Sequence, residues 1–184
     1  MTIKQGELLK ADDWQVQYCQ KANPGSNNLS LLSYGSVRIK SGVKTDYLMH
    51  HKQESIIFCM NGSVAVEVEG EHFTLTYYDT LYLPSDTPYR LENSSSEEGY
   101  LLNCRAESEN KHKPVYSSWK EVSVDQSRIK KLEGKDVFMM FDVTEEADNL
   151  VAGYTIYEPN TRAWPVHNHT DQEEIYIFTK GRGS

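Results

Sequence analysis

The sequence lacks any apolar run close to the roughly 18 residues that a membrane-spanning helix requires. Its first 14 residues, Met1 to Trp14, are polar and lack the apolar centre of a signal peptide. We therefore expect no membrane partner. Cysteine is also scarce, and Cys19, Cys59 and Cys104 are an odd number in unrelated surroundings. This usage predicts free buried thiols in a reducing compartment, and hence a cytoplasmic protein.

The chain has no cluster of basic residues. Its formal net charge is −8 and its pI is near 5.2. The lysines at 111, 113, 130 and 131 are scattered along the chain and are expected to be solvated. Nucleic acid needs a basic surface, so we expect no nucleic-acid partner.

What the sequence does contain favours β structure. It has 12 tyrosines and few runs of alanine or leucine. In 63–69 valines alternate with other residues, and Glu69-Gly70-Glu71 then turns the chain into 72–77, which predicts a hairpin. Many short strands at this spacing are typical of a sandwich or barrel. The predicted strands are 29–39, 46–50, 55–60, 63–69, 72–77, 80–83, 88–92 and 99–105.

The predicted organisation has four parts. Residues 1–28 form a polar N-terminal segment that ends in a turn-rich stretch. Residues 29–106 hold the first barrel. Residues 107–148 are a linker and connecting segment, with a possible short helix and an apolar stretch at 137–141. A second β region begins in 149–184. The length of 184 residues suits one large domain, or one domain and part of a second.

The richest stretch of the sequence contains His167, His169 and Glu174. On a strand, side chains two residues apart point to the same face, with backbones roughly 7 Å apart. A tight connection before the next strand, which we expect Glu174 to open, brings its carboxylate opposite the two imidazoles. Two histidines and a carboxylate suit a divalent metal ion that must also bind a substrate. The alternative is that these are surface residues around a loop.

The spacing of this site matches the first cupin motif, which reads His-x-His, four residues, Glu, six residues and Gly. The final glycine falls on Gly181. Glu173 is a competing carboxylate, but Glu174 fits the distance to Gly181 better. The sequence therefore resembles a cupin, which implies an all-β fold built as a double-stranded β-helix, or jelly-roll, barrel.

A weak internal repeat supports this interpretation. The stretch from His50 to Gly62 aligns with His169 to Gly181, so that Leu48 and Ser55 fall where His167 and Glu174 lie. In the second cupin motif of this first barrel, Asp79, Pro84 and Asn93 keep their spacing, whereas Tyr89 replaces the usual histidine and Asp86 the usual glycine. The first barrel is thus predicted to be structural, although His50, His51 and Glu54 could form some other site.

The whole layout resembles the bicupin family of 5-deoxyglucuronate isomerase and 4-deoxy-5-hexosulose-uronate ketol-isomerase. The resemblance is carried by Asn149 to Tyr154, Trp164 to Asp171 and Glu173 to Tyr176. It implies a degenerate first barrel and the start of a second cupin barrel that holds the metal. The family's fourth ligand, a histidine in a later motif, has no counterpart before Ser184. We therefore expect a fragment, or a sheet that residues 150–184 complete with the first barrel or a partner chain.

The resemblance implies a sugar-acid substrate and a divalent cofactor, namely Zn, Mn, Ni or Fe, without specifying which. The ion would bind the carbonyl and hydroxyl oxygens of the substrate and stabilise the enediolate formed on proton abstraction. Arg162 is a candidate for binding the substrate carboxylate. Trp164 and Tyr176 are candidates for lining a sugar pocket, or else for the barrel core. No catalytic base can be assigned.

Three functional hypotheses remain. One is a metal-dependent aldose–ketose isomerase of sugar acids. The second is another metallo-cupin enzyme, such as an oxygenase with Fe or Cu, or a hydrolase. The third is a non-catalytic cupin that binds a small molecule or forms a structural dimer. A homodimer is expected by analogy with cupins and from the open strand edges of an incomplete barrel.

Overall fold

The computed structural model describes residues 15–25, 28–145, 147–161 and 170–181, and strands dominate its secondary structure. Two short helical turns, α1 (Trp119–Val122) and η1 (Gln126–Arg128), interrupt them. The strands are β1 (Val16–Ala22), β2 (Ser33–Ile39), β3 (Val43–Lys44), β4 (Gln53–Asn61), β5 (Val64–Val68), β6 (Glu71–Leu75), β7 (Thr80–Leu83), β8 (Tyr89–Asn93), β9 (Gly99–Glu107), β10 (Val115–Ser117), β11 (Ile129–Leu132), β12 (Lys135–Phe141) and β13 (Ala152–Tyr157). The all-β prediction is confirmed.

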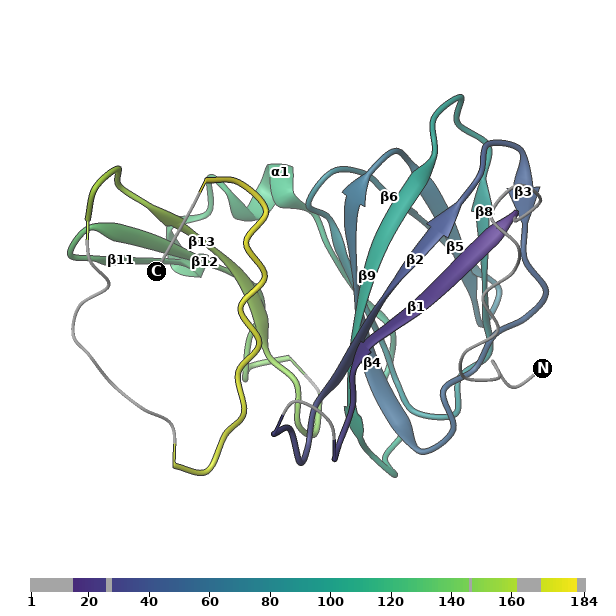
Figure 1. Cartoon of the computed structure of the whole chain (residues 1–184), viewed down its shortest axis with the longest axis horizontal. Coiled ribbons are helices and arrows are strands. Elements are labelled where there is room, and N and C mark those ends of the chain that lie inside the picture. The colour runs from purple at the N-terminus through teal and green to yellow at the C-terminus, as the bar shows by residue number, and fades with distance from the viewer. Residues whose placement is uncertain (1–14, 26–27, 146, 162–169, 182–184) are drawn as a thin grey trace.

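Two antiparallel sheets form a barrel from the first ten strands (Figure 1). The larger sheet has the order β1-β2-β9-β4-β7-β10, and the smaller one β3-β8-β5-β6. Apolar side chains from both sheets meet in one buried cluster, which includes Ile39, Ile57, Val66, Leu91 and Leu101. This arrangement is the predicted jelly-roll barrel of the cupin fold.

The hairpin of β5 and β6 illustrates how the sequence determines the local structure. Val64, Val66 and Val68 are fully buried, because alternate residues of a strand face the same side. The two-residue turn at Glu69 and Gly70 has positive φ at both positions, 51° and 82°. Such turns match the twist of antiparallel strands and therefore fix their register.

Two glycines that the internal repeat aligns both occupy left-handed backbone conformations. Gly62 has a φ of 76° and Gly181 a φ of 83°. A Cβ on Gly62 would also lie 2.7 Å from the carbonyl oxygen of Glu98. Glycine is the residue that adopts this conformation without steric cost. The first barrel thus keeps the turn of the motif that the repeat predicts.

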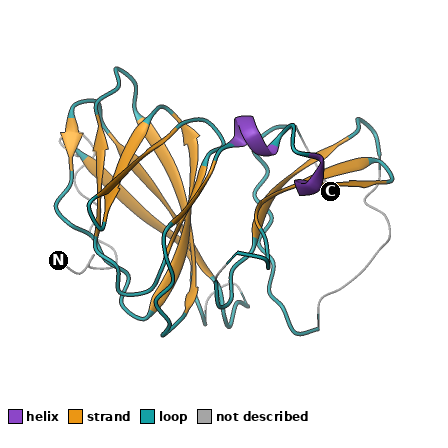
Figure 2. Cartoon of the chain, turned by 180° about the vertical axis from the view of Figure 1, so that it is seen from behind, coloured by secondary structure: helices purple, strands orange, loops and turns teal. Residues whose placement is uncertain are grey.

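A second lobe lies beside the barrel, with α1 between the two (Figures 1 and 2). Its three-stranded antiparallel sheet has the order β11-β12-β13. Trp119 of α1 packs against a small core that contains Val122, Phe138 and Met140. The predicted connecting segment, 107–148, therefore contributes β10, α1, η1, β11 and β12, and the last two strands pair into the same sheet as β13.

The outer face of the six-stranded sheet joins the barrel to this lobe. The aromatic rings of Tyr82 from β7 and Phe141 from β12 stack with centroids 4.7 Å apart, and both residues are 1% exposed. Beside them the fully buried carboxylate of Glu54 accepts hydrogen bonds from the hydroxyl of Tyr82 and from the backbone N–H groups of Asp148 and Asn149, at 2.9, 3.0 and 2.7 Å. A buried carboxylate is tolerated because three donors satisfy it.

Several predicted elements differ from the observed ones. The part described as polar, 1–28, contains β1, which forms an edge of the larger sheet. The predicted strand 46–50 is reduced to one bridge between Leu48 and Tyr89. Residues 172–179 do not form a strand, because they find no backbone pairing partner in the described part of the chain. Glu174 therefore does not begin a strand there, contrary to the prediction.

All three cysteines are free, as predicted, but they differ in exposure. Cys59 is buried, Cys104 is partly buried and Cys19 is exposed, because Cys19 lies on the outward face of the edge strand β1. The prediction of buried thiols is thus wrong for Cys19. Among the described residues, no helix is long and apolar enough to cross a membrane.

The contacts of Glu54 predict a strong effect of its removal. Glu54→Ala leaves one buried and two partly buried donors without their acceptor, so the free energy of unfolding should fall by about 3 kcal/mol. Urea denaturation measures this change. Proteolysis near 144–149 should also accelerate, because that backbone loses its anchor to the barrel.

The matched control is Glu107→Ala, which removes an exposed glutamate from β9 of the same sheet. Its unfolding free energy should stay within about 0.5 kcal/mol of the parent protein. Equal stability of the Glu54→Ala and Glu107→Ala variants would show that Glu54 does not join the two lobes.

Candidate functional site

The predicted metal and substrate residues fall in two groups. His167, His169, Arg162 and Trp164 lie outside the described residues. Glu174 and Tyr176 are described, in the segment 170–181 that runs between the barrel and the second lobe (Figure 1). The structure therefore locates the carboxylate and the tyrosine of the predicted site.

Glu173, the competing carboxylate, is engaged elsewhere. Its side chain accepts hydrogen bonds from three successive backbone N–H groups, those of Ser30, Leu31 and Leu32, the last two at 2.9 and 2.8 Å. These bonds, that from Leu32 foremost, lower the pKa of Glu173, because they favour its charged form. Glu173 thus attaches the segment to the entry of β2.

Tyr176 lies next to Glu174. Partial burial and a hydrogen bond to the Glu174 carboxylate raise the pKa of Tyr176 to about 12. The side chain is nevertheless 57% exposed, so it is not part of a barrel core among the described residues. Its hydroxyl stays protonated at neutral pH and can donate a hydrogen bond.

The other end of the segment contacts an aromatic cluster. The hydroxyl groups of Thr179 and Tyr78 lie 3.1 Å apart, and the ammonium group of Lys180 lies 5.3 Å from the ring centroid of Tyr77. Tyr78 in turn packs against Tyr154 of β13, with ring centroids 4.5 Å apart. The segment is thus attached to the barrel at both ends, on either side of Glu174.

In the first barrel, the repeat-aligned positions meet in the interior. The Nε2 atom of His50 lies 2.9 Å from the hydroxyl of Tyr89 and 3.2 Å from the Nδ2 atom of Asn103. Burial, followed by the charge of Arg105, lowers the pKa of His50 to about 3. His50 is therefore a neutral imidazole whose Nε2 accepts hydrogen bonds.

The alternative site of His50, His51 and Glu54 does not form. His51 is exposed and its Nδ1 atom lies 2.6 Å from Asp86. Glu54 faces the second lobe, on the opposite side of the sheet from the barrel interior. The three side chains therefore occupy different environments.

The side chains around His50 and those of the predicted C-terminal site differ in how well they suit a metal ion. Among the described residues, His50 Nε2 contacts a phenol and an amide and neither a carboxylate nor a second imidazole, which is a poor set for a divalent ion. No group of three or more His, Cys, Asp or Glu side chains that could hold a metal occurs in the described ranges. The predicted set of His167, His169 and Glu174 fits such an ion by its chemistry.

Sequence reasoning missed Arg105 and the strand that supplies its neighbours Tyr18 and Gln20. The hydroxyl of Tyr18 and an Nη of Arg105 both bond the Oε1 atom of Gln20, at 2.8 and 2.5 Å. The alternation of Val16, Tyr18, Gln20 and Ala22 is the signal that could have revealed β1.

The lowered pKa of His50 predicts a pH dependence of stability. Between the ordinary value of 6.5 and about 3, the unfolded chain binds a proton at His50 that the folded chain does not. The free energy of unfolding contributed by this group is therefore complete above pH 6.5 and falls with decreasing pH, by about 2 kcal/mol between pH 7 and 5. Urea denaturation at pH 7 and pH 5 measures this fall. His50→Gln should lose about 2 kcal/mol less unfolding free energy between the two pH values than the parent protein does.

His51→Gln is the control, because it removes an exposed neighbouring histidine. This variant should keep the full loss of stability between pH 7 and 5. If His50→Gln and the parent protein lose the same free energy over this interval, His50 is not buried in its neutral form.

The chain is similar to several solved structures. The chain resembles the crystal structure of a proposed glyoxylate-induced protein from Pseudomonas aeruginosa, with a TM-score of 0.63 and 11% identity over 79% of this chain and 56% of the other. The cupin domain of Schizosaccharomyces pombe Cnp3 is matched over 52% of this chain and 67% of that domain, with a TM-score of 0.46 and 14% identity.

A curated relative matches part of the sequence. It is an uncharacterised protein of Methanocaldococcus jannaschii, 30% identical over 63 residues, or 34% of this chain and 50% of the relative. The chain thus spans about half the length of this relative and of the Pseudomonas structure. The model of the KduI/IolB family matches residues 7–180. That match covers nearly all of the sequence, and the chain therefore belongs to the KduI/IolB family of cupin proteins.

Proposed function

We propose that the protein is a metal-dependent isomerase that interconverts aldose and ketose forms of a sugar acid, with its site in the segment around Glu174. The observation that carries the proposal is the match to the KduI/IolB family over residues 7–180. It agrees with the motif residues at 167, 169 and 174, which were identified from spacing alone.

The metal would be held by His167, His169 and Glu174. The three hydrogen bonds of Glu173 to the entry of β2 support this choice of carboxylate, because they direct Glu173 toward residues 30–32. A divalent ion, Zn, Mn, Ni or Fe, supplies positive charge that stabilises the oxygens of an enediolate. Contacts at 173 and at 179–180 attach the segment to the barrel on both sides of Glu174, which limits the freedom of that carboxylate.

Substrate binding is proposed for Arg162, Trp164 and Tyr176. A guanidinium group at Arg162 can bind a carboxylate through two parallel hydrogen bonds. Tyr176 is exposed and its hydroxyl donates to Glu174, so its oxygen can accept a hydrogen bond from a sugar hydroxyl. Trp164 offers an aromatic face to the apolar side of a sugar ring.

We propose that the second lobe is the start of a second cupin barrel. The sheet β11-β12-β13 and the following segment are the parts that support this interpretation, and the sheet begins at Ile129, within the connecting segment. Among the described residues, β13 pairs only with β12, and Ile156 and Phe178 are 53% and 69% exposed. Open edges and exposed apolar side chains favour association, so a homodimer is proposed. We also propose a cytoplasmic location, supported by the three free thiols.

The test combines metal content with proton exchange at carbon. The full chain is incubated with D-glucuronate or D-galacturonate in D2O, and NMR follows deuterium entry beside the carbonyl carbon, since an enediolate exchanges that proton with solvent. The parent protein should contain near-stoichiometric metal by elemental analysis and catalyse exchange. His167→Ala and Glu174→Gln should lose most of the metal and at least 100-fold in exchange rate.

Glu173→Gln is the matched control, one residue from Glu174. It should keep its metal, because its carboxylate bonds backbone N–H groups rather than the site. Loss of metal in Glu173→Gln but not in Glu174→Gln would reverse the assignment. Oxygen consumption without deuterium entry would indicate an oxygenase, and metal-independent binding of the sugar without exchange would indicate a non-catalytic cupin.

A further inference from the structure

One end of the first barrel's interior is polar, although the rest of it is apolar. On β9, Leu101 belongs to the core between the sheets, so Asn103 and Arg105, two and four residues further, face the same interior. On β4 and β2 the same alternation places Ser55 and Ser33 inside, at the end opposite the apolar cluster. In the sheet register, Ser33 and Ser55 are the direct neighbours of Arg105 on either side.

The positively charged side chain of Arg105 is surrounded by uncharged groups. Its Nη atoms bond the side-chain oxygens of Gln20 and Gln53, at 2.5 and 3.4 Å, and its guanidinium carbon lies 6.0 Å from the ring centroid of Tyr18. Within the described ranges, no ion pair joins Arg105 to a carboxylate. Its Nε atom is buried and has no hydrogen-bond partner among the residues that the structure describes. A part-buried cation that lacks an anion is costly, so an anion bound here would be stabilised.

Three further polar atoms at this end are also buried and have no hydrogen-bond partner in the described part of the chain. They are the hydroxyl oxygens of Ser33 and Ser55 and the Oδ1 atom of Asn103, in residues 2%, 1% and 2% exposed. Buried polar groups are almost always paired, so a molecule that offers partners to these atoms would be stabilised here. Arg105 and the two serines can donate to an oxyanion, whereas the Oδ1 atom of Asn103 can accept from a hydroxyl.

We propose that this polar end of the first barrel binds a small hydroxy acid. Arg105, flanked by Ser33 and Ser55, binds the carboxylate, and Asn103 accepts a hydrogen bond from the hydroxyl group. The site is independent of metal, because it relies on a guanidinium, two hydroxyls and an amide. It shares no residue with the site proposed around Glu174, so either site can be tested without the other.

The test uses the 15N NMR signal of the Nε–H group of Arg105 in the full chain, with EDTA present to remove metal. Glycolate is the probe, and glycolamide is its uncharged analogue. Glycolate should shift the Arg105 signal saturably. The dissociation constant from this titration should be at least tenfold lower for glycolate than for glycolamide. Acetate, which lacks the hydroxyl, should bind several-fold more weakly than glycolate, and this preference should disappear in Asn103→Leu.

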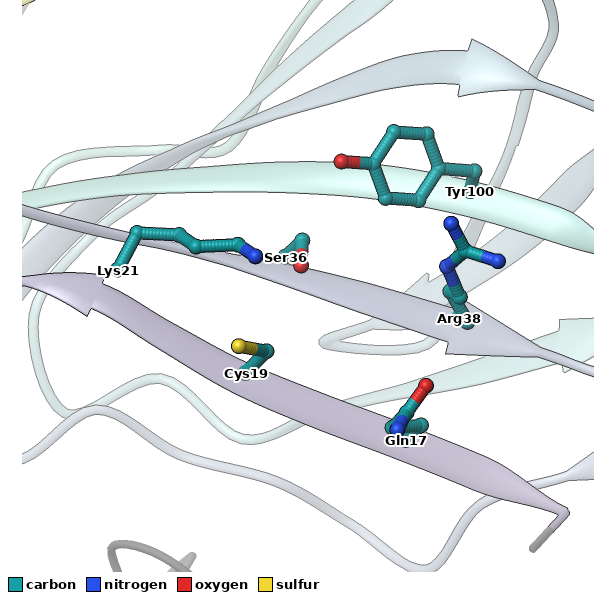
Figure 3. Close-up of a pocket in the computed structure, with 6 residues that line it drawn as sticks. All are labelled: Gln17, Cys19, Lys21, Ser36, Arg38 and Tyr100. Carbon is teal, nitrogen blue, oxygen red and sulfur yellow. The ribbon is translucent and has the colours of Figure 1, made fainter. Parts of the chain in front are cut away.

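Arg105→Gln should abolish glycolate binding, measured by calorimetry, and Ser55→Ala should weaken it several-fold. The control is Arg38→Gln, because Arg38 lies on the opposite face of the same sheet, in the hollow of Figure 3, and pairs with Glu98 at 3.2 Å. Arg38→Gln should bind glycolate as the parent protein does. An Arg105 signal that glycolate leaves unchanged would overturn the proposal, as would unaltered binding in Arg105→Gln. If Arg105→Gln does not fold, the titration of the parent protein decides the question.

Discussion

The arrangement of the two lobes depends on the contact between one buried carboxylate of the barrel and the connection from β12 to β13. Glu54 accepts hydrogen bonds from Tyr82 on its own sheet and from Asp148 and Asn149, about 95 residues further along the chain. The Asp148 side chain is in turn bonded by Ser108, Asn110 and His112, which lower its pKa to about 2. These bonds fix the connection from β12 to β13 against the barrel, and thereby where β13 and the segment around Glu174 can lie.

The barrel and the C-terminal segment divide the chemistry of the chain. In the barrel, His50 is neutral and bonded to Tyr89 and Asn103, so the position that a cupin metal would occupy is filled by a hydrogen-bonded network. The charge of the barrel interior resides instead on Arg105. In the C-terminal segment, Glu173 bonds backbone N–H groups and Glu174 remains beside Tyr176. The barrel interior therefore suits an organic anion, and the proposed metal site lies in the C-terminal segment.

The sequence predicted the elements whose evidence is local. Alternating valines and a two-residue turn identified β5 and β6, and motif spacing aligned His50 with a position that indeed faces Tyr89. It did not predict β1, because polar side chains on an edge strand obscure its alternation. The role of Glu54 was not predictable, since its partners are distant in sequence. Arg105 was missed for the same reason: its neighbours come from three other strands.

The central claim is that metal binds in the C-terminal segment and not in the first barrel. Titration of the 15N-labelled full chain with Mn²⁺ tests it, because a paramagnetic ion broadens the signals of nearby amides. The account predicts that the amides of 171–179 broaden at the lowest Mn²⁺ concentrations, while those of His50, Ser55 and Tyr89 remain sharp. Selective broadening around His50, with 171–179 unaffected, would contradict it.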